Sequence, residues 1–287
     1  MRFKNFHPLT HIVYFSSVLY FSMISRNLVL LSISFLFALL SVTVMKKRSD
    51  ILIYLSIFII IALMNPFFSH NGRTVLFFFS GQRFTLEAVI FGIGAALAII
   101  SAIYWFKLFG IVFGTDKLSW AVGSLSPKLG IVLTMAMRFV PLFKENAENI
   151  HNAQKSLGLY DNNTFFGKVK TALNTFSALI SLSIENAVET ADTMRARGFR
   201  GGRKTSYYRF HMTKYDICAV TFIVLSDVFL AVLFAKGAAK FWYYPKIVYK
   251  ASYEAYLLYG FFALLCAVPI INEIKEDLRW KYLISKI

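Results

Sequence analysis

The chain contains little charge for its length. Asp, Glu, Lys and Arg make up 16% of its 287 residues, against roughly 25% in an ordinary soluble domain. Hydrophobic residues account for 57% of the sequence and aromatic residues for 17%. This composition is typical of a membrane protein. Once the apolar runs are assigned to the lipid bilayer, no soluble domain remains to bind nucleic acid, so we expect no nucleic-acid partner.

Acidic residues are scarcer than basic ones. The 31 Lys and Arg outnumber the 15 Asp and Glu, which gives a formal net charge of +16. The excess is concentrated outside the apolar runs. Basic loops beside apolar spans follow the positive-inside pattern, and they also suit the anionic cytoplasmic leaflet or an acidic protein partner.

Residues that carry catalytic or metal chemistry are few and dispersed. Cys218 and Cys266 lie within apolar runs and offer neither a disulfide framework nor metal-ligand spacing. Neither HExxH nor GxSxG occurs, and Gly202 is followed by Arg203 rather than by the lysine of a P-loop. We therefore expect no catalytic residue, no cofactor and no metal. The scattered histidines are interpreted as interfacial or capping residues (His7, His11, His70, His151 and His211).

The apolar runs predict membrane-spanning helices. They cover residues 12–25, 27–45, 51–64, 85–109, 217–235 and 256–271, and most approach the length that a span requires. Residues 1–8 lack the layout of a cleaved signal peptide, so we expect the first span to be retained. The predicted fold is an all-α, polytopic membrane helix bundle with about six membrane segments. Residues 67–84 are interpreted as an interfacial or re-entrant excursion on the outer side.

The basic run Lys46-Lys47-Arg48 sets the predicted topology. It follows the second span and places that loop in the cytoplasm, together with the amino terminus. By the same count, the loop between the last two spans lies outside, although it holds four lysines (Lys236, Lys240, Lys246 and Lys250). This conflicts with the positive-inside pattern. We keep the topology because the early spans usually dominate orientation.

Charge and polarity rise between the fourth and fifth spans. We therefore divide the chain into N-terminal membrane segments (1–110), a cytoplasmic module (111–214), and C-terminal membrane segments with a cytoplasmic tail (215–287), within one integrated domain. Residues 144–157 are predicted as a short amphipathic helix that ends at Gly158. A long amphipathic helix follows, with apolar residues at helical spacing. These are Leu173, Phe176, Leu179, Ile180, Ile184, Ala187, Val188, Ala191 and Met194.

The end of this long helix carries the most distinctive pattern in the chain. From Thr193 to Lys214 there are seven basic residues and no acidic one. Gly198 stands where a helix C-terminus favours a residue that can adopt positive φ. Arg195 and Arg197 then fall in the last turn, where cations offset the negative end of the helix dipole. The plainer alternative is a helix stop with the basic bias of a cytoplasmic loop.

Four stretches occur here in a familiar order: Asn65-Pro66, residues 137–142, the polar helix 147–158, and residues 194–202. Over nearly its whole length, the chain resembles the T component of energy-coupling factor (ECF) transporters, the transmembrane coupling subunit. The resemblance includes the subunits found with cobalt and nickel uptake systems. Its most specific part is the motif Ala196-Arg197-Gly198.

The resemblance implies a non-catalytic cell-membrane subunit of an ABC-type uptake transporter for a vitamin or a transition metal. It would join two cytoplasmic ATPase subunits to a small membrane subunit that binds the substrate. In the family, two coupling helices end in Ala-Arg-Gly motifs whose arginines dock in acidic grooves of the ATPases. The second motif is intact here at Ala196-Arg197-Gly198, with Arg195 beside it. The first falls at Ser156-Leu157-Gly158, where Leu157 stands in place of the arginine.

Two other classes of function stay open. A membrane-embedded enzyme needs clustered His, Asp or Glu, or a nucleophile beside a base, and no such constellation is apparent. A self-sufficient channel or carrier needs polar residues along several spans. Asp227 lies in the middle of a span, and we interpret it as making a structural hydrogen bond to a Ser or Tyr inside the bundle. Co-purification of an ATPase and a small membrane protein would favour the coupling subunit.

Overall fold

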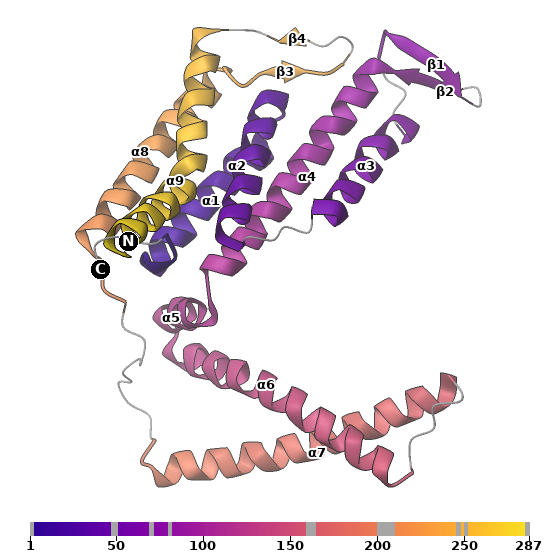
Figure 1. Ribbon diagram of the computed structural model, residues 1–287, viewed down its shortest axis with the longest axis vertical. Helices are drawn as coiled ribbons and strands as arrows, with labels where there is room; N and C mark the ends of the chain where they lie inside the picture. The colour runs from indigo at the N-terminus through magenta and orange to yellow at the C-terminus, as the bar shows by residue number, and fades with distance from the viewer. Residues whose placement is uncertain are drawn as a thin grey trace. The chain divides into compact units, whose positions relative to one another are not determined.

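The computed structural model describes residues 3–46, 51–68, 72–79, 82–158, 165–199, 210–244, 248–249 and 252–284. The chain divides into two compact units (Figure 1). The first unit combines Met1–Gly114 with Phe210–Ile287, and the second is Thr115–Arg209. The second unit is therefore an insertion between two parts of the first.

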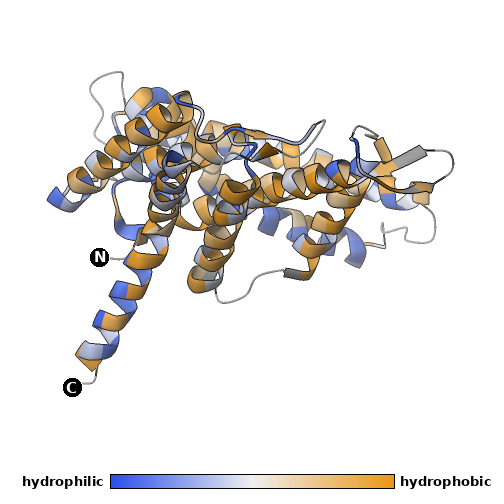
Figure 2. Cartoon of the chain, turned by 90° about the horizontal axis from the view of Figure 1, so that it is seen from above, coloured by the Kyte–Doolittle hydropathy of each residue, from blue (hydrophilic) through white to orange (hydrophobic). Residues whose placement is uncertain are grey.

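The described part of the first unit is a bundle of apolar helices, preceded by the short 3-10 helix η1 (Phe3–Asn5). The helices are α1 (Pro8–Ile24), α2 (Leu28–Lys46), α3 (Ile51–Phe68), α4 (Leu86–Val112), α8 (Lys214–Ala235) and α9 (Tyr253–Ile284). By length and composition, α2, α4, α8 and α9 can each cross a membrane, and α1 and α3 are shorter apolar helices. Hydrophobic residues dominate these helices in Figure 2. The predicted all-α membrane bundle is confirmed, with its spans falling on these helices.

The ends of the bundle differ in what they carry. One end holds the starts of α1 and α8 and the ends of α4 and α9 (Figure 1). The other end, called the hairpin end below, holds two small antiparallel hairpins. The first pairs β1 (Val75–Phe79) with β2 (Gln82–Thr85), and the second pairs β3 (Phe241–Trp242) with β4 (Val248–Tyr249). The excursion predicted at residues 67–84 is thus largely a β-hairpin at this end.

Hydrogen bonds between helices occur in the buried core. The Trp105 indole N–H donates to the Ser34 hydroxyl at 3.0 Å, which links α4 to α2. The Tyr14 hydroxyl donates to the backbone carbonyl of Leu265 at 3.1 Å, which links α1 to α9. In a low-dielectric interior an unpaired polar group is costly, so these bonds favour one arrangement of the helices. Within α8, Asp227 accepts a hydrogen bond from the Ser17 hydroxyl of α1, which confirms its predicted structural role.

Helix α3 continues past the point where the sequence predicts an interruption. It runs through Asn65-Pro66 and ends at Phe68. Pro66 has no N–H to donate to the carbonyl of Ala62, four residues earlier. That carbonyl instead faces Gly92 of α4, where an added Cβ would lie only 2.6 Å from the oxygen. The lost helical bond is accommodated by close packing of two helices, and α3 does not break.

The second unit consists of three helices in its described residues. They are α5 (Thr115–Leu125), α6 (Pro127–Ser156) and α7 (Phe165–Ala196). The prediction of a short helix over residues 144–157 is wrong, because α6 begins much earlier and contains Pro141. Pro127 lies in the first turn, where its missing N–H costs nothing, and Pro141 removes only one internal bond. Long helix α7 is confirmed up to the residue before Arg197.

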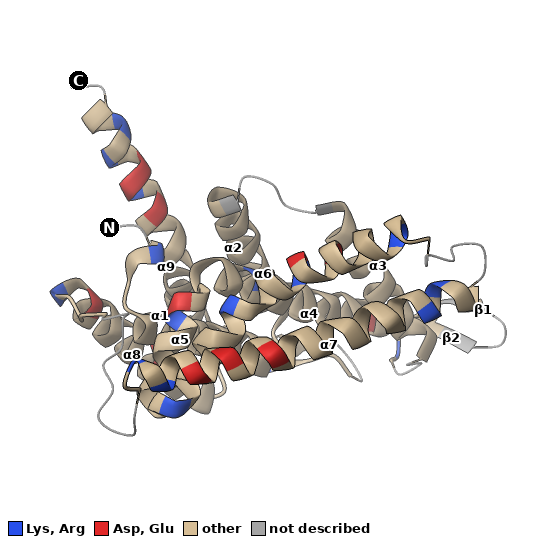
Figure 3. Ribbon diagram, turned by 90° about the horizontal axis from the view of Figure 1, so that it is seen from below, with Lys and Arg blue, Asp and Glu red and all other residues tan. Residues whose placement is uncertain are grey.

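Helix α9 is also longer than the predicted span over residues 256–271. It covers 32 residues, which corresponds to about 48 Å at the usual helical rise. The hydrocarbon core of a bilayer is about 30 Å thick. The residues expected to form a charged tail therefore continue the same helix, up to Ile284. Figure 3 shows acidic and basic residues along this terminal part of α9.

Candidate functional site

Helix α7 ends in a hydrogen-bonded turn at Gly198. The N–H of Gly198 donates to the carbonyl of Arg195 at 3.0 Å, and the N–H of Phe199 donates to that of Met194 at 2.9 Å. This pair of bonds is the Schellman motif. It requires a left-handed residue at its centre, and Gly198 has a φ of +75°. Arg197 is thereby fixed as the residue at the tip of the helix, followed by a turn away from the axis.

Helix α6 ends in a similar turn at Gly158, where one of the two bonds of the motif falls within the described residues. The N–H of Leu157 donates to the carbonyl of Ala153 at 3.0 Å, and that of Gly158 donates to Lys155 at 3.2 Å. Gly158 has a φ of +71°, close to that of Gly198. Leu157 therefore occupies the position at this tip that Arg197 occupies at the other. Leu157 is 73% exposed, so its side chain is accessible to a partner.

The two arginines at the end of α7 differ in their surroundings. Arg195 lies 4.0 Å from the Asp192 carboxylate, one helical turn earlier, and both side chains are well exposed. For Arg197, which is also exposed, no ion pair or side-chain hydrogen bond is found among the described residues. Of the two arginines, Arg197 is therefore the one whose charge no described residue offsets. The apolar motif residue Ala196 and Gly198 beside it leave the guanidinium sterically accessible.

The two helix tips lie far apart along α7. The Thr175 hydroxyl of α7 donates to the Gln154 side-chain oxygen at 2.9 Å, so the end of α6, with Ser156 and Leu157, crosses near Thr175. Arg197 follows Thr175 by 22 residues, which is ~33 Å along the helix axis. Figure 1 shows α6 and α7 crossing, with their carboxyl-terminal ends directed to opposite sides. One groove cannot receive both tips.

The apolar stripe predicted for α7 is exposed in the described unit. Five of its large members are more than 40% accessible to solvent, namely Leu173, Phe176, Ile180, Ile184 and Val188. Leu179 and Met194 are half-buried. A continuous exposed apolar surface of this kind usually marks a contact with a partner or a membrane. A separate row of acidic residues, Glu185, Glu189 and Asp192, follows the same helix (Figure 3).

A buried carboxylate that the sequence analysis does not single out links two helix starts. Asp216 accepts the backbone N–H of His7 at 2.8 Å and that of Thr213 at 2.9 Å. With Thr213 it forms the capping box of α8, while the His7 ring accepts the N–H of Leu9 and caps α1. The pattern Thr213-x-x-Asp216 is a recognisable capping signature. The partnership with His7, over 200 residues away, is visible only in the structure. His7 has the capping role predicted for it.

Glu87, at the hairpin end, has a comparable role. Its carboxylate accepts the backbone N–H groups of Arg73 at 3.3 Å and of Thr74 at 3.2 Å, and it is almost completely buried. It therefore holds the chain that enters β1 against the start of α4. These hydrogen bonds stabilise the negative charge of Glu87, which lies near the outer end of a predicted span. The role is structural, because the carboxylate is enclosed by its own loop.

Comparison with known protein families gives one match that covers most of the chain. The model of the family described as cobalt transport protein matches residues 6–208. These residues include α1 to α7 and both helix tips.

Individual relatives fall into two groups. An uncharacterized protein, the MG181 homolog of Mycoplasma pneumoniae, is 32% identical over 133 residues, which is 45% of this chain and 31% of that protein. The energy-coupling factor transporter transmembrane protein EcfT of Streptococcus equi subsp. equi is 25% identical over 245 residues, covering 77% of this chain and 87% of the relative. EcfT of Lactobacillus helveticus is 27% identical over 174 residues, covering 52% and 62%. The matched region thus spans about a third of the Mycoplasma relative and most of the streptococcal one.

Proposed function

The chain belongs to the cobalt transport protein family, whose model covers residues 6–208, and from this premise we propose that it is the transmembrane coupling subunit, or T component, of an ECF transporter. It is a multi-pass membrane protein, and we place it in the cell membrane. In this proposal it has no catalytic activity. It transmits the motion of two cytoplasmic ABC-type ATPase subunits to a small membrane subunit that binds a vitamin or a transition metal.

The observation that carries this proposal is the pair of matched helix ends. Helices α6 and α7 both end in an exposed residue followed by a left-handed glycine, at Leu157-Gly158 and Arg197-Gly198. Their separation of ~33 Å along α7 suits two docking points on two different subunits.

The chemistry of Arg197 suits an acidic groove. A guanidinium presents a planar fork of donors that matches the two oxygens of a carboxylate, and such charge-assisted bonds are the strong ones. Because Arg197 has no compensating acid among the described residues, a carboxylate on another protein adds a pairing that the free chain does not already make. Desolvation at the interface raises the cost of losing one partner to a few kcal/mol.

The Leu157 tip docks differently. An exposed leucine gains roughly 1.5–3 kcal/mol when a partner buries it fully. Lys155, two residues earlier, adds a positive charge near this tip, but an ammonium does not reproduce the fork of a guanidinium. In the proposal, Ser156-Leu157-Gly158 therefore contacts its ATPase mainly through apolar burial, and Ala196-Arg197-Gly198 contacts the other ATPase mainly through charge.

The test of this function is reconstitution with partners. The chain should co-purify with two ATPase copies and one small membrane protein, and vesicles that contain all of them should take up substrate only with ATP. The chain alone should neither hydrolyse ATP nor transport. ATP hydrolysis by the purified chain would favour the enzyme alternative. Uptake by the chain alone would favour a self-sufficient carrier.

A further inference from the structure

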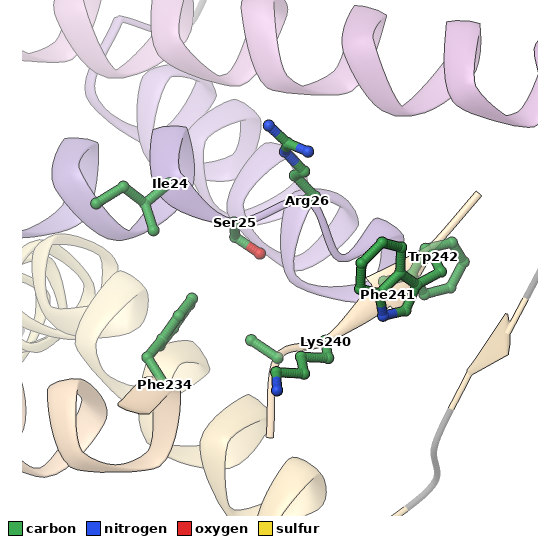
Figure 4. A pocket seen from close by; sticks show the side chains of 8 residues that line it. Ile24, Ser25, Arg26, Phe234, Lys240, Phe241 and Trp242 are labelled. Atoms are coloured by element: carbon green, nitrogen blue, oxygen red, sulfur yellow. The ribbon is translucent and has the colours of Figure 1, made fainter. Parts of the chain in front are cut away.

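A small open cavity lies at the hairpin end, where the loop from α1 to α2 meets the chain that follows α8. It has a volume of about 240 Å³. Ile24, Ser25 and Arg26 line one side, and Phe234 and residues 239–242 line the other. Figure 4 shows Arg26 and Lys240 reaching the cavity from different segments, with their charged groups directed away from each other.

Hydrogen bonds hold the wall formed by the α1–α2 loop. The N–H of Ser25 donates to the carbonyl of Phe21 at 3.2 Å, and the Ser25 hydroxyl accepts the N–H of Asn27 at 3.2 Å. The Tyr243 hydroxyl donates to the carbonyl of Arg26 at 2.7 Å and ties this wall to the opposite one. The protein's own hydrogen bonds therefore hold the two walls together, so the cavity is preformed, as ligand sites usually are.

The charge at the cavity is positive and is not offset. Arg26 and Lys240 are exposed, and neither makes an ion pair with a described residue. None of the residues that line the cavity is acidic. Lys236 of the same loop differs, because its ammonium lies 3.6 Å from the Glu254 carboxylate. Among the described residues, Lys236 is thus neutralised, whereas Arg26 and Lys240 have no acidic partner and can attract an anion.

The surroundings of the cavity are apolar and aromatic. At the end of α1, Met23 is 67% exposed and Ile24 is 51% exposed, and Trp242 at the rim is 63% exposed. Exposed aliphatic side chains beside Trp, Lys and Arg are the arrangement found where a membrane protein crosses from hydrocarbon to headgroups. A ligand that matches both features has an anionic head and an apolar body.

We propose that this cavity binds the phosphate-bearing headgroup of an anionic phospholipid, in the leaflet at the hairpin end. The acyl chains lie against the exposed ends of α1 and α8, and the phosphate is attracted by Arg26 and Lys240. This role accounts for basic residues on the side where the predicted topology disfavours them. It is independent of the coupling function, because it involves neither helix tip.

The experiment uses the purified full chain in a neutral detergent, with lipid retention measured by native mass spectrometry. Phosphatidylglycerol should be retained in preference to phosphatidylcholine with the same acyl chains. The double variant Arg26→Gln/Lys240→Gln should bind phosphatidylglycerol roughly 30-fold more weakly, the order expected for removing two cations from a membrane surface. Arg73→Gln/Lys236→Gln removes two charges from the same end without touching the cavity, and it should bind within about twofold of the parent.

A second variant separates the cavity from general surface charge. Ala239→Phe keeps both cations but fills the space that Ala239 lines, so it should also weaken phosphatidylglycerol binding. Unchanged binding in Ala239→Phe, or an equal loss in the charge control, would overturn the assignment. Equal retention of phosphatidylcholine would overturn it as well. Competition by inorganic phosphate at millimolar concentration would show that the cavity takes free phosphate, not lipid.

Discussion

Arg197 is the residue on which the coupling role depends most directly. It is held at a helix tip by the turn at Gly198 and has no acid to neutralise it among the described residues. Arg197→Ala should therefore lower ATPase retention and uptake at least tenfold, because truncating one member of a desolvated charge pair costs about 2–5 kcal/mol. Arg197→Lys should restore only part of the activity, since the charge returns without the planar fork.

Arg195→Ala is the matched control for Arg197. It removes the same charge and side chain from the same helical turn, but Arg195 already lies 4.0 Å from Asp192 and both groups are exposed. Exposed pairs contribute about 0–1 kcal/mol, so the control should act weakly. Pull-down of the ATPases and uptake in reconstituted vesicles measure both effects. Normal transport in Arg197→Ala would remove the coupling role from this residue.

At Leu157 the informative substitution introduces an arginine, whereas the substitutions at Arg197 remove one. Leu157 itself can contribute only apolar burial, but we expect the groove around its tip to resemble the one that receives Arg197. Leu157→Arg should then be tolerated or should strengthen ATPase association. Gly158 already provides the left-handed turn that an arginine motif requires, with a φ of +71°. Association is measured by pull-down, with Leu157→Ala as the control that removes apolar burial. Complete loss of ATPase binding in Leu157→Arg would indicate a closed apolar pocket at this tip.

His7 predicts a dependence of stability on pH. Burial lowers the pKa of its imidazole below the ordinary value, and this outweighs the opposing effects of the Asp216 carboxylate and the Phe210 backbone. The unfolded chain therefore binds a proton at a higher pH than the folded one. Stability from this group is present above the unfolded value of about 6.5 and is lost as pH falls below it. Protonation also removes the lone pair that accepts the N–H of Leu9.

The measurement for His7 is thermal unfolding in detergent at pH 7.5 and at pH 5.5. The melting temperature of the parent should fall on acidification. His7→Asn keeps a capping acceptor but does not titrate, so its fall should be smaller. Equal falls in the parent and in His7→Asn would assign the acid sensitivity to other groups.

At the scale of single residues, the sequence predicts features that depend on the conformational freedom of one residue, such as a glycine that ends a helix. The sequence predicts helix ends at Gly158 and Gly198 because glycine adopts positive φ without strain, and both residues have a positive φ. The contact between His7 and Asp216 joins residues 209 positions apart. No local pattern contains such a contact, because it depends on how the helices pack. The docking roles of the tip residues remain predictions.

At the scale of elements, the packing of α3 on α4 depends on Gly92. A Cβ there would lie 2.6 Å from the Ala62 carbonyl oxygen and 3.1 Å from the Asn65 side chain. Gly92→Ala should therefore push the helices apart and destabilise the bundle by about 1–3 kcal/mol, as overpacking does. Thermal unfolding in detergent measures the change.

Gly110→Ala is the control within the same helix. An added Cβ at Gly110 meets nothing within 4 Å, and alanine is a better helix former by up to about 1 kcal/mol. This variant should be neutral or slightly stabilising. If both substitutions lowered the melting temperature equally, the Ala62 contact would not explain the need for glycine at position 92.

Apolar runs predict helices more reliably than they predict where helices end. The runs gave the membrane helices because uninterrupted apolar segments have few other stable forms in lipid. Helices α3 and α6 both extend beyond their predicted bounds, because α3 passes Pro66 after the apolar run 51–64 and α6 passes Pro141 before the predicted helix 144–157. The hairpin of β3 and β4 cannot be predicted from the sequence, because each strand has only two residues, too few to show a strand period. The continuation of α9 to Ile284 is not predicted, because this part of the helix is rich in charged residues and contains no long apolar run.

At the scale of the molecule, the helix order makes a topological prediction. The starts of α1 and α8 and the ends of α4 and α9 share one end of the first unit, and both hairpins lie at the other (Figure 1). The second unit leaves and rejoins the first at the end without hairpins, because it connects α4 to α8. If that unit meets cytoplasmic ATPases, the hairpin end must face outward.

Labelling with an impermeant thiol reagent tests this orientation in intact cells. In a background with Cys218→Ala and Cys266→Ala, a cysteine at Arg73 should be labelled from outside, and one at Lys155 should be labelled only after the membrane is opened. Arg73 and Lys155 are both exposed polar positions, so accessibility in the folded chain does not separate them. Labelling of position 155 from outside would place the α6 tip on the wrong side for ATP-driven coupling. Labelling of position 73 only in opened cells would instead put the lysines of the β3–β4 region in the cytoplasm, where the positive-inside pattern alone would place them.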